Sequence, residues 1–166
     1  MTLNSEITIC QADLSDIDEL HEIESLSFSP EKAASYEAFK YRLEKFPQWF
    51  FKAVLDSRIV GLIDGSCSVQ PYITDELYES GGAFDDSAEN LLIYGLAVHP
   101  QYRGMRIAHR LMEHFIGAAR AAGKKHISLT CKESLIGFYE SLGYSCHGLS
   151  ESVLGNVVSY DMELYL

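Results

Sequence analysis

One stretch, residues 90–122, constrains the fold of this chain more than any other. Its first part, residues 91–98, is an almost unbroken apolar run of strand length, rich in strand-forming residues. Pro100 ends this run because proline cannot donate a hydrogen bond to a strand ladder. From Ile107 apolar residues recur at steps of three and four, until Gly123 supplies a helix stop. The stretch therefore predicts a strand, a tight turn and a helix.

The turn between this strand and this helix, residues 101–106, is expected to bind an anion. Its successive backbone N–H groups continue into the unpaired N–H groups of the first helical turn. Together they form a concave site that suits negatively charged oxygens. A diphosphate group would fit such a site.

Length and composition indicate one cytoplasmic domain, residues 1–166, large enough to bury a core. The sequence shows neither a secretory signal nor an apolar run of about 20 residues, so no membrane partner is expected. The net charge of −11 argues against nucleic acid as a partner and favours a cationic substrate. The four cysteines lack the spacing of a zinc site, so we predict reduced thiols and no metal.

The N-terminal part predicts one strand followed by two helices. Residues 6–11 alternate apolar and polar side chains, which is typical of a strand. Ser15 and Asp18 have the spacing of a capping box at the start of the first helix. The acidic residues of that helix, Glu24 included, are interpreted as a solvated face. Ser29-Pro30 is predicted to cap and open the second helix.

A hairpin and a long acidic loop follow. Residues 49–55 and 59–69 read as two antiparallel strands joined by turn-forming residues 56–58. Residues 71–89 have no regular pattern, and two interpretations stay open: a mobile solvated segment, or a lid that attracts cations. The acidic residues of this loop are Asp75, Glu76, Glu79, Asp85, Asp86 and Glu89.

The C-terminal part completes a β-α-β unit and adds two strands. Residues 126–131 alternate like a short strand, which would lie parallel to the strand at 91–98. Ser134 is predicted to cap a short helix that ends at Gly143. Two further strands are expected around residues 144–149 and 157–166.

Two sequence motifs resemble one known family. The run LAVHPQYRGMRIA resembles the acyl-CoA-binding motif of the GCN5-related N-acetyltransferase (GNAT) superfamily, whose core is R/Q-x-x-G-x-G/A. Arg103 and Ala108 match the ends of that core, but Arg106 stands where the pattern has glycine. Downstream, FYESLGY is similar to a second signature of the superfamily. The similarity covers about residues 90–166 and looks closest to arylalkylamine N-acetyltransferases.

The resemblance implies a fold, a cosubstrate and a set of site residues. The implied fold is a single α/β (α+β) domain with a splayed, mixed, mostly antiparallel sheet of about seven strands and about four flanking helices. The implied cosubstrate is acetyl-CoA, and Tyr139 would be the general acid that protonates the departing thiolate. The implied binding residues are Leu96, Ala97 and Val98 for the pantetheine arm, and Arg103, Gly104, Met105, Arg106, Ile107, Ala108 and His109 for the pyrophosphate.

The resemblance leaves the proton acceptor and the substrate open. Animal arylalkylamine enzymes carry two histidines at positions that are Leu92 and Tyr94 here, so another group must deprotonate the amine. Tyr94, Glu89 and Asp161 are the candidates for this relay. The expected function is acetyl transfer to a small primary amine, an (aryl)alkylamine or polyamine-like molecule, with homodimerisation left open. The alternatives are a protein or peptide N-acetyltransferase and an inactive acyl-CoA-binding regulatory domain.

Overall fold

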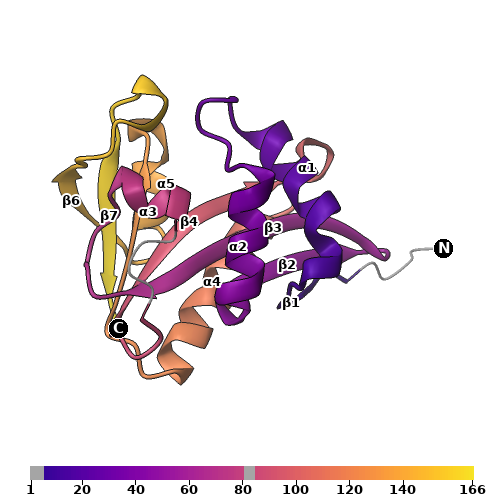
Figure 1. Ribbon diagram of the computed structural model, residues 1–166, viewed down its shortest axis with the longest axis horizontal. Coiled ribbons are helices and arrows are strands. Elements are labelled where there is room, and N and C mark those ends of the chain that lie inside the picture. The colour runs from indigo at the N-terminus through magenta and orange to yellow at the C-terminus, as the bar shows by residue number, and fades with distance from the viewer. Residues whose placement is uncertain (1–5, 81–84) are drawn as a thin grey trace.

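The computed structural model describes residues 6–80 and 85–166 and contains a seven-stranded sheet in the order β1-β2-β3-β4-β5-β7-β6 (Figure 1). All neighbouring strands are antiparallel except β4 and β5, which are parallel. The predicted fold is therefore confirmed. The strands are β1 (Thr8–Gln11), β2 (Phe50–Leu55), β3 (Arg58–Ser68), β4 (Asn90–Val98), β5 (His126–Cys131), β6 (Ser145–Leu149) and β7 (Tyr160–Tyr165).

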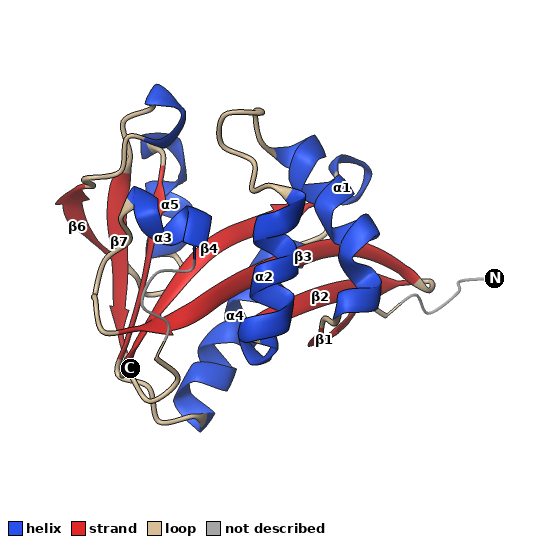
Figure 2. Cartoon of the chain, in the orientation of Figure 1, coloured by secondary structure: helices blue, strands red, loops and turns tan. Residues whose placement is uncertain are grey.

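Helices cover both faces of the sheet. Figure 2 shows α1 and α2 in front of β2, β3 and β4, and α4 behind them. The described residues contain five α-helices rather than about four: α1 (Ile17–Ser27), α2 (Tyr36–Lys45), α3 (Asp75–Ser80), α4 (Ile107–Ala121) and α5 (Ile136–Glu140). None of the helices in this part of the chain is long and apolar enough to cross a membrane.

The β-α-β unit forms as the sequence predicts. The apolar stripe of α4, with Ile107, Leu111 and Phe115 almost fully buried, packs against the sheet. The hairpin between β2 and β3 is also confirmed. Asp56 and Ser57 both have positive φ angles, 50° and 64°, as a two-residue turn of type I′ requires.

The sheet opens between β4 and β5. These strands pair only from Asn90 opposite His126 to Leu92 opposite Ser128, and Figure 1 shows them diverging beyond that point. On its other side β4 stays paired with β3. Gly95 lies opposite Asp64 and Ile93 lies opposite Gly65, so Tyr94 between them is an extra residue without a partner position on β3. This β-bulge bends β4 at the opening.

Both predicted helix caps in the N-terminal part were wrong, the first by two residues and the second by six. The capping box belongs to Asp13, whose side chain accepts from the Ser15 N–H, before a short 3₁₀ turn that leads into α1. Helix α2 begins at Tyr36 with Ser35 as its cap, because the Ala38 N–H donates to the Ser35 Oγ at 3.1 Å. Ser29 lies instead in a hydrogen-bonded turn, because its carbonyl accepts from residues 32 and 33.

Two other local predictions also need correction. The loop predicted at 71–89 contains the helix α3, and its residues 81–84 lie outside the described part of the chain. Ser134 does not cap α5. It lies within a 3₁₀ turn, Glu133–Leu135, that precedes the helix, and the N-cap of α5 is Leu135, which makes no side-chain capping bond.

Candidate active site

Two adjoining cavities occupy the opening between β4 and β5. The larger measures about 860 Å³ and the smaller about 420 Å³. Both sizes fall in the range of small-molecule sites. The residues that line both cavities are Ser27, Phe28, Leu96, Lys132, Leu135 and Tyr139. The two cavities therefore meet between the end of β4 and helix α5.

The larger cavity brings together nearly all of the predicted cofactor-binding residues. Met105 is the exception among the described residues, and its side chain is 46% exposed. The predicted residues that line this cavity are Leu96, Ala97, Val98, Arg103, Gly104, Arg106, Ile107, Ala108 and His109.

The turn that forms one end of this cavity is held by two left-handed residues. Gly104 has a φ of +83°, and Arg106 has φ and ψ of 60° and 24°. The left-handed conformation costs a non-glycine residue about 1–2 kcal/mol, which is the physical reason for glycine at this place in the family pattern. Arg106 is also the N-cap of α4 and makes no side-chain capping bond. The first N–H groups of α4 are therefore left for an anion.

One edge of β4 forms the wall of the larger cavity. Beyond Leu92 the main chain of β4 has no pairing with β5 among the described residues. An extended ligand can bind such an edge as an added strand, through main-chain hydrogen bonds. The part of β4 that remains exposed in this way contains Leu96, Ala97 and Val98.

Tyr139 lies where the two cavities meet. It projects from α5, is 7% exposed and lines both cavities. Burial raises the pKa of its phenol well above the ordinary value, and the nearby Cys131 and Tyr78 act in the same direction. Its hydroxyl therefore keeps its proton at neutral pH and can donate it.

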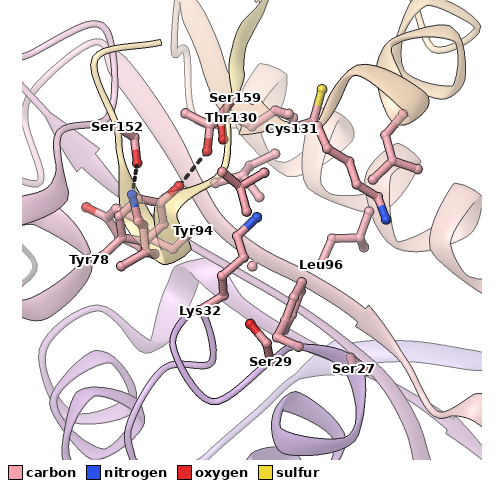
Figure 3. A pocket seen from close by; sticks show the side chains of 18 of the residues that line it. Ser27, Ser29, Lys32, Tyr78, Tyr94, Leu96, Thr130, Cys131, Ser152 and Ser159 are labelled. Atoms are coloured by element: carbon pink, nitrogen blue, oxygen red, sulfur yellow. Dashed lines mark hydrogen bonds between the residues drawn. The ribbon is translucent and has the colours of Figure 1, made fainter.

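The smaller cavity is lined by side chains from several elements (Figure 3). Tyr78 of α3 is hydrogen-bonded to Thr130 of β5, with 2.6 Å between their oxygens. The segment between β6 and β7 is tied to α3, because the Ser152 hydroxyl and the Val153 N–H donate to Asp75 at 2.5 and 3.1 Å. Lys32, from the segment between α1 and α2, points into the cavity.

A buried charged cluster lies beside the smaller cavity, and sequence reasoning missed it. Glu24 of α1 lines the cavity and is 4% exposed, so its assignment to a solvated face was wrong. Burial, followed by the charge of Asp64, raises the pKa of Glu24 to about 7. One signal was present: Glu24 follows Ile17 and Leu20 at helical steps of seven and four, and so continues their apolar stripe.

Asp64 and Arg42 form the other part of this cluster. Asp64 lies in β3 with no exposed surface, and the Arg42 guanidinium donates to it at 2.9 Å. Arg42 also donates to the main-chain oxygen of Tyr78 at 2.7 Å and lies 4.9 Å from the ring centre of Tyr94. A carboxylate inside a buried strand needs such a partner, so Asp64 within an apolar run was the available sequence signal.

The candidates for the proton relay lie in different places. Tyr94 lines the smaller cavity, and its hydroxyl lies 2.6 Å from the Ser66 hydroxyl. Glu89, just before β4, and Asp161, on β7 opposite Thr130, are not among the described residues that line either cavity. No group of three or more acidic, histidine or cysteine side chains in this part of the chain is placed to hold a metal ion.

Comparisons with known proteins point to one family. A family model described as the acetyltransferase (GNAT) family matches residues 17–144. None of the curated protein sequences matches this chain.

Solved structures share the whole fold at low sequence identity. The loading GNATL domain of CurA from Lyngbya majuscula superposes with a TM-score of 0.83 and 16% identity, over 96% of this chain and 98% of that one. The GNAT-like decarboxylase GphF, in complex with isobutyryl-CoA, superposes with a TM-score of 0.82 and 20% identity, over 95% of this chain and 98% of that one. For the ribosomal-protein-S18-alanine N-acetyltransferase from Escherichia coli the TM-score is 0.75 and the identity 15%, over 96% of this chain and 94% of that one.

Proposed function

Because this chain belongs to the acetyltransferase (GNAT) family, we propose that it transfers the acetyl group of acetyl-CoA directly to a small primary amine. The observation that carries the proposal is the pair of cavities that meet at Leu96 and Tyr139. Two substrates bound in them would touch at that junction. Transfer between them needs no covalent intermediate on the enzyme, because bound reactants in contact already have a high effective concentration.

The larger cavity suits acetyl-CoA in both of its recognition elements. The turn at Gly104 and Arg106 presents main-chain N–H groups to a diphosphate, and the outward guanidinium of Arg106 can add a forked contact. The unpaired edge of β4 at Ala97 and Val98 offers main-chain groups to the amides of the pantetheine arm. When bound, acetyl-CoA supplies the thioester that acylates the amine.

Tyr139 is proposed as the general acid. Its phenol lies at the junction of the cavities and stays protonated at neutral pH, so it can protonate the thiolate that leaves. A main-chain N–H of β4 near Leu96 would stabilise the negative charge that develops on the acyl oxygen. Both groups belong to packed elements and need no rearrangement for the reaction.

The acceptor is proposed to be a small (aryl)alkylamine or polyamine-like molecule. The smaller cavity measures only about 420 Å³, and the contacts of Asp75 and Tyr78 fix α3 at its wall, which supports a small acceptor over a peptide. Phe28, Tyr78 and Tyr94 line it and offer aromatic surface. Lys32 also lines it, so an acceptor that carries an anionic group is not excluded by charge.

Release of coenzyme A thiol tests the proposal. Wild-type protein is assayed with acetyl-CoA and a panel of aryl amines, polyamines, aminoglycosides and peptides. Small amines should accelerate thiol release and peptides should not. Tyr139→Phe should lower turnover by about 10²–10⁴-fold, since general acids contribute in that range, without weakening acetyl-CoA binding.

Tyr144→Phe is the matched control. Tyr144 is also a buried tyrosine at the end of the same segment, but it lines neither cavity among the described residues. Removal of the Tyr144 hydroxyl should leave turnover within a few-fold of wild type. Equal effects of the two substitutions would remove Tyr139 from the mechanism, and thiol release only with peptides would replace the small amine by a peptide acceptor.

A further inference from the structure

Two buried carboxylates converge on one point beside the smaller cavity, directly over Gly95. A Cβ atom on Gly95 would lie 2.8 Å from Oδ1 of Asp64 and 3.5 Å from Oε1 of Glu24. Neither of these oxygens has a hydrogen-bond partner among the described residues. Unpaired carboxylate oxygens in a protein interior are costly, because they have lost the hydrogen bonds of water. The point over Gly95 is therefore suited to a group that donates hydrogen bonds.

The other oxygen of each carboxylate is held by the protein. The main-chain N–H of Ala34 donates to Oε2 of Glu24 at 2.9 Å, and Arg42 donates to Oδ2 of Asp64 at 2.9 Å. Each carboxylate is thus fixed through one oxygen and presents the second one toward Gly95. This is the arrangement expected of a preorganised binding site rather than of a closed structural ion pair.

We propose that Glu24 binds the ammonium group of the acceptor amine and takes up its proton, with Asp64 behind it adding negative charge at this point. The inference rests on the proposed function, since it concerns the acceptor of that reaction. Glu24 and Gly95 both line the smaller cavity, and Gly95 adjoins Leu96, where the two cavities meet. Glycine at position 95 keeps a side chain away from these two oxygens, since a Cβ there would lie 2.8 Å from Oδ1 of Asp64.

The proton balance follows from the reaction. The ammonium group gives one proton to the Glu24 carboxylate and becomes a neutral amine with a free electron pair. That pair forms the C–N bond to the acetyl carbon, the C–S bond breaks, and the sulfur takes a proton from Tyr139. The nitrogen loses a second proton, which restores the tyrosine, and Glu24 returns its own proton to water. Each acetamide formed therefore releases one net proton.

Glu24 is better suited than Asp64 to accept the proton. The charge of Asp64 is balanced by Arg42 at 2.9 Å. Burial and the charge of Asp64 raise the pKa of Glu24 to about 7, although the Ala34 N–H and Arg42 act in the opposite direction. A base with a pKa near the working pH combines availability with proton affinity. The charged and titratable groups described around Glu24 and its cavity are Lys32, Arg42, Asp64, Tyr78, Tyr94, Cys131, Lys132 and Tyr139.

The test substitution is Glu24→Gln, which keeps an oxygen for the Ala34 N–H. With a primary alkylamine as acceptor, kcat/KM should fall by roughly 10²–10³-fold, while acetyl-CoA binding changes less than about two-fold. In wild type, kcat/KM should rise with pH through about 7, and this rise should disappear in the variant. Glu22→Gln, on the exposed side of the same helix, is the matched control and should behave like wild type.

An acceptor that needs no deprotonation separates a chemical role from a structural one. The nitrogen of an alkoxyamine is uncharged at neutral pH, so Glu24→Gln should slow its acetylation much less than that of the matching alkylamine. Gly95→Ala supplies a second variant, because its Cβ would crowd Oδ1 of Asp64 and Oε1 of Glu24 and so displace the carboxylate proposed to hold the ammonium group. It should block transfer to the alkylamine and preserve acetyl-CoA binding. Gly117→Ala in α4, where an added Cβ meets nothing within 4 Å, is its control.

Three results would overturn the inference. The Glu24→Gln variant could retain kcat/KM within a few-fold of wild type, or its kcat/KM could still rise with pH near 7. The fall in kcat/KM could also be equal for the alkylamine and the alkoxyamine. Each of these leaves acetyl transfer itself intact. Failure of the wild-type protein to acetylate any amine would instead refute the proposed function, and the inference with it.

Discussion

The unusual burial of Glu24 predicts that its replacement by glutamine stabilises the protein in a pH-dependent manner. The folded protein raises the pKa of Glu24 from 4.5 to about 7. Stability from this group is therefore fully present below about 4.5 and is lost as the pH rises through about 7. A shift of about 2.5 units corresponds to at most roughly 3 kcal/mol, since each unit is worth about 1.36 kcal/mol.

Urea unfolding of wild type and Glu24→Gln at pH 5 and pH 8 measures this effect. The two proteins should differ little at pH 5, and the variant should be more stable by up to about 3 kcal/mol at pH 8. Titrating groups that do not interact with Glu24 behave alike in both proteins, so they cancel in the difference. Glu22→Gln, on the exposed face, should show no such pH dependence. A variant that is less stable than wild type at pH 8, or a difference independent of pH, would refute the reasoning.

Three further predictions concern the turn and the sheet. Acetyl-CoA at about 100 times its dissociation constant should stabilise wild type by about 2.7 kcal/mol, which raises Tm by roughly 5–10 °C. Gly104→Asp should abolish this rise in Tm. An unmoved wild-type melting curve would contradict the cosubstrate assignment. Arg106→Gly should raise the unfolding free energy by up to about 1 kcal/mol, because glycine relieves the left-handed strain but is more flexible when unfolded; destabilisation would argue against strain at this position. Gly65→Ala should lower the free energy of unfolding by about 1–3 kcal/mol or more, since a Cβ there would lie 2.2 Å from the Leu92 carbonyl oxygen. Gly117→Ala, in helix α4, should raise it by about 0.5–1 kcal/mol. Equal denaturation midpoints for the two variants would contradict this packing.

The features that local sequence determines were predictable. The hairpin turn at Asp56 and Ser57, the apolar stripe of α4 and the β-α-β unit all follow from residues close together in the chain. The turn at 101–106 was recognised from the motif that begins at Arg103, and the residue that departs from the motif, Arg106, adopts the left-handed conformation for which glycine is suited.

The charged cluster was not predictable in the same way because its contacts are distant in sequence. Glu24 accepts a hydrogen bond from the Ala34 main chain and lies near Asp64, and Arg42 pairs with Asp64 across 22 positions. Side-chain periodicity placed Glu24 on the boundary between an apolar and a polar face, and only tertiary packing decides which side it joins. The predicted start of the second helix was wrong for a related reason. Residues 29–33 form a hydrogen-bonded turn, from which Ser29 and Lys32 line the smaller cavity, although Ser29-Pro30 is a good helix start.

The most direct test of the proposed acetyl transfer is to count its two products together. Purified protein is incubated with acetyl-CoA and a small primary amine, and the released thiol and the N-acetylated amine are quantified in the same reaction. The account predicts equal amounts of both, formed at a rate that Tyr139→Phe reduces by about 10²–10⁴-fold. Thiol without acetamide, or no thiol above the protein-free rate with any amine of the panel, would contradict it.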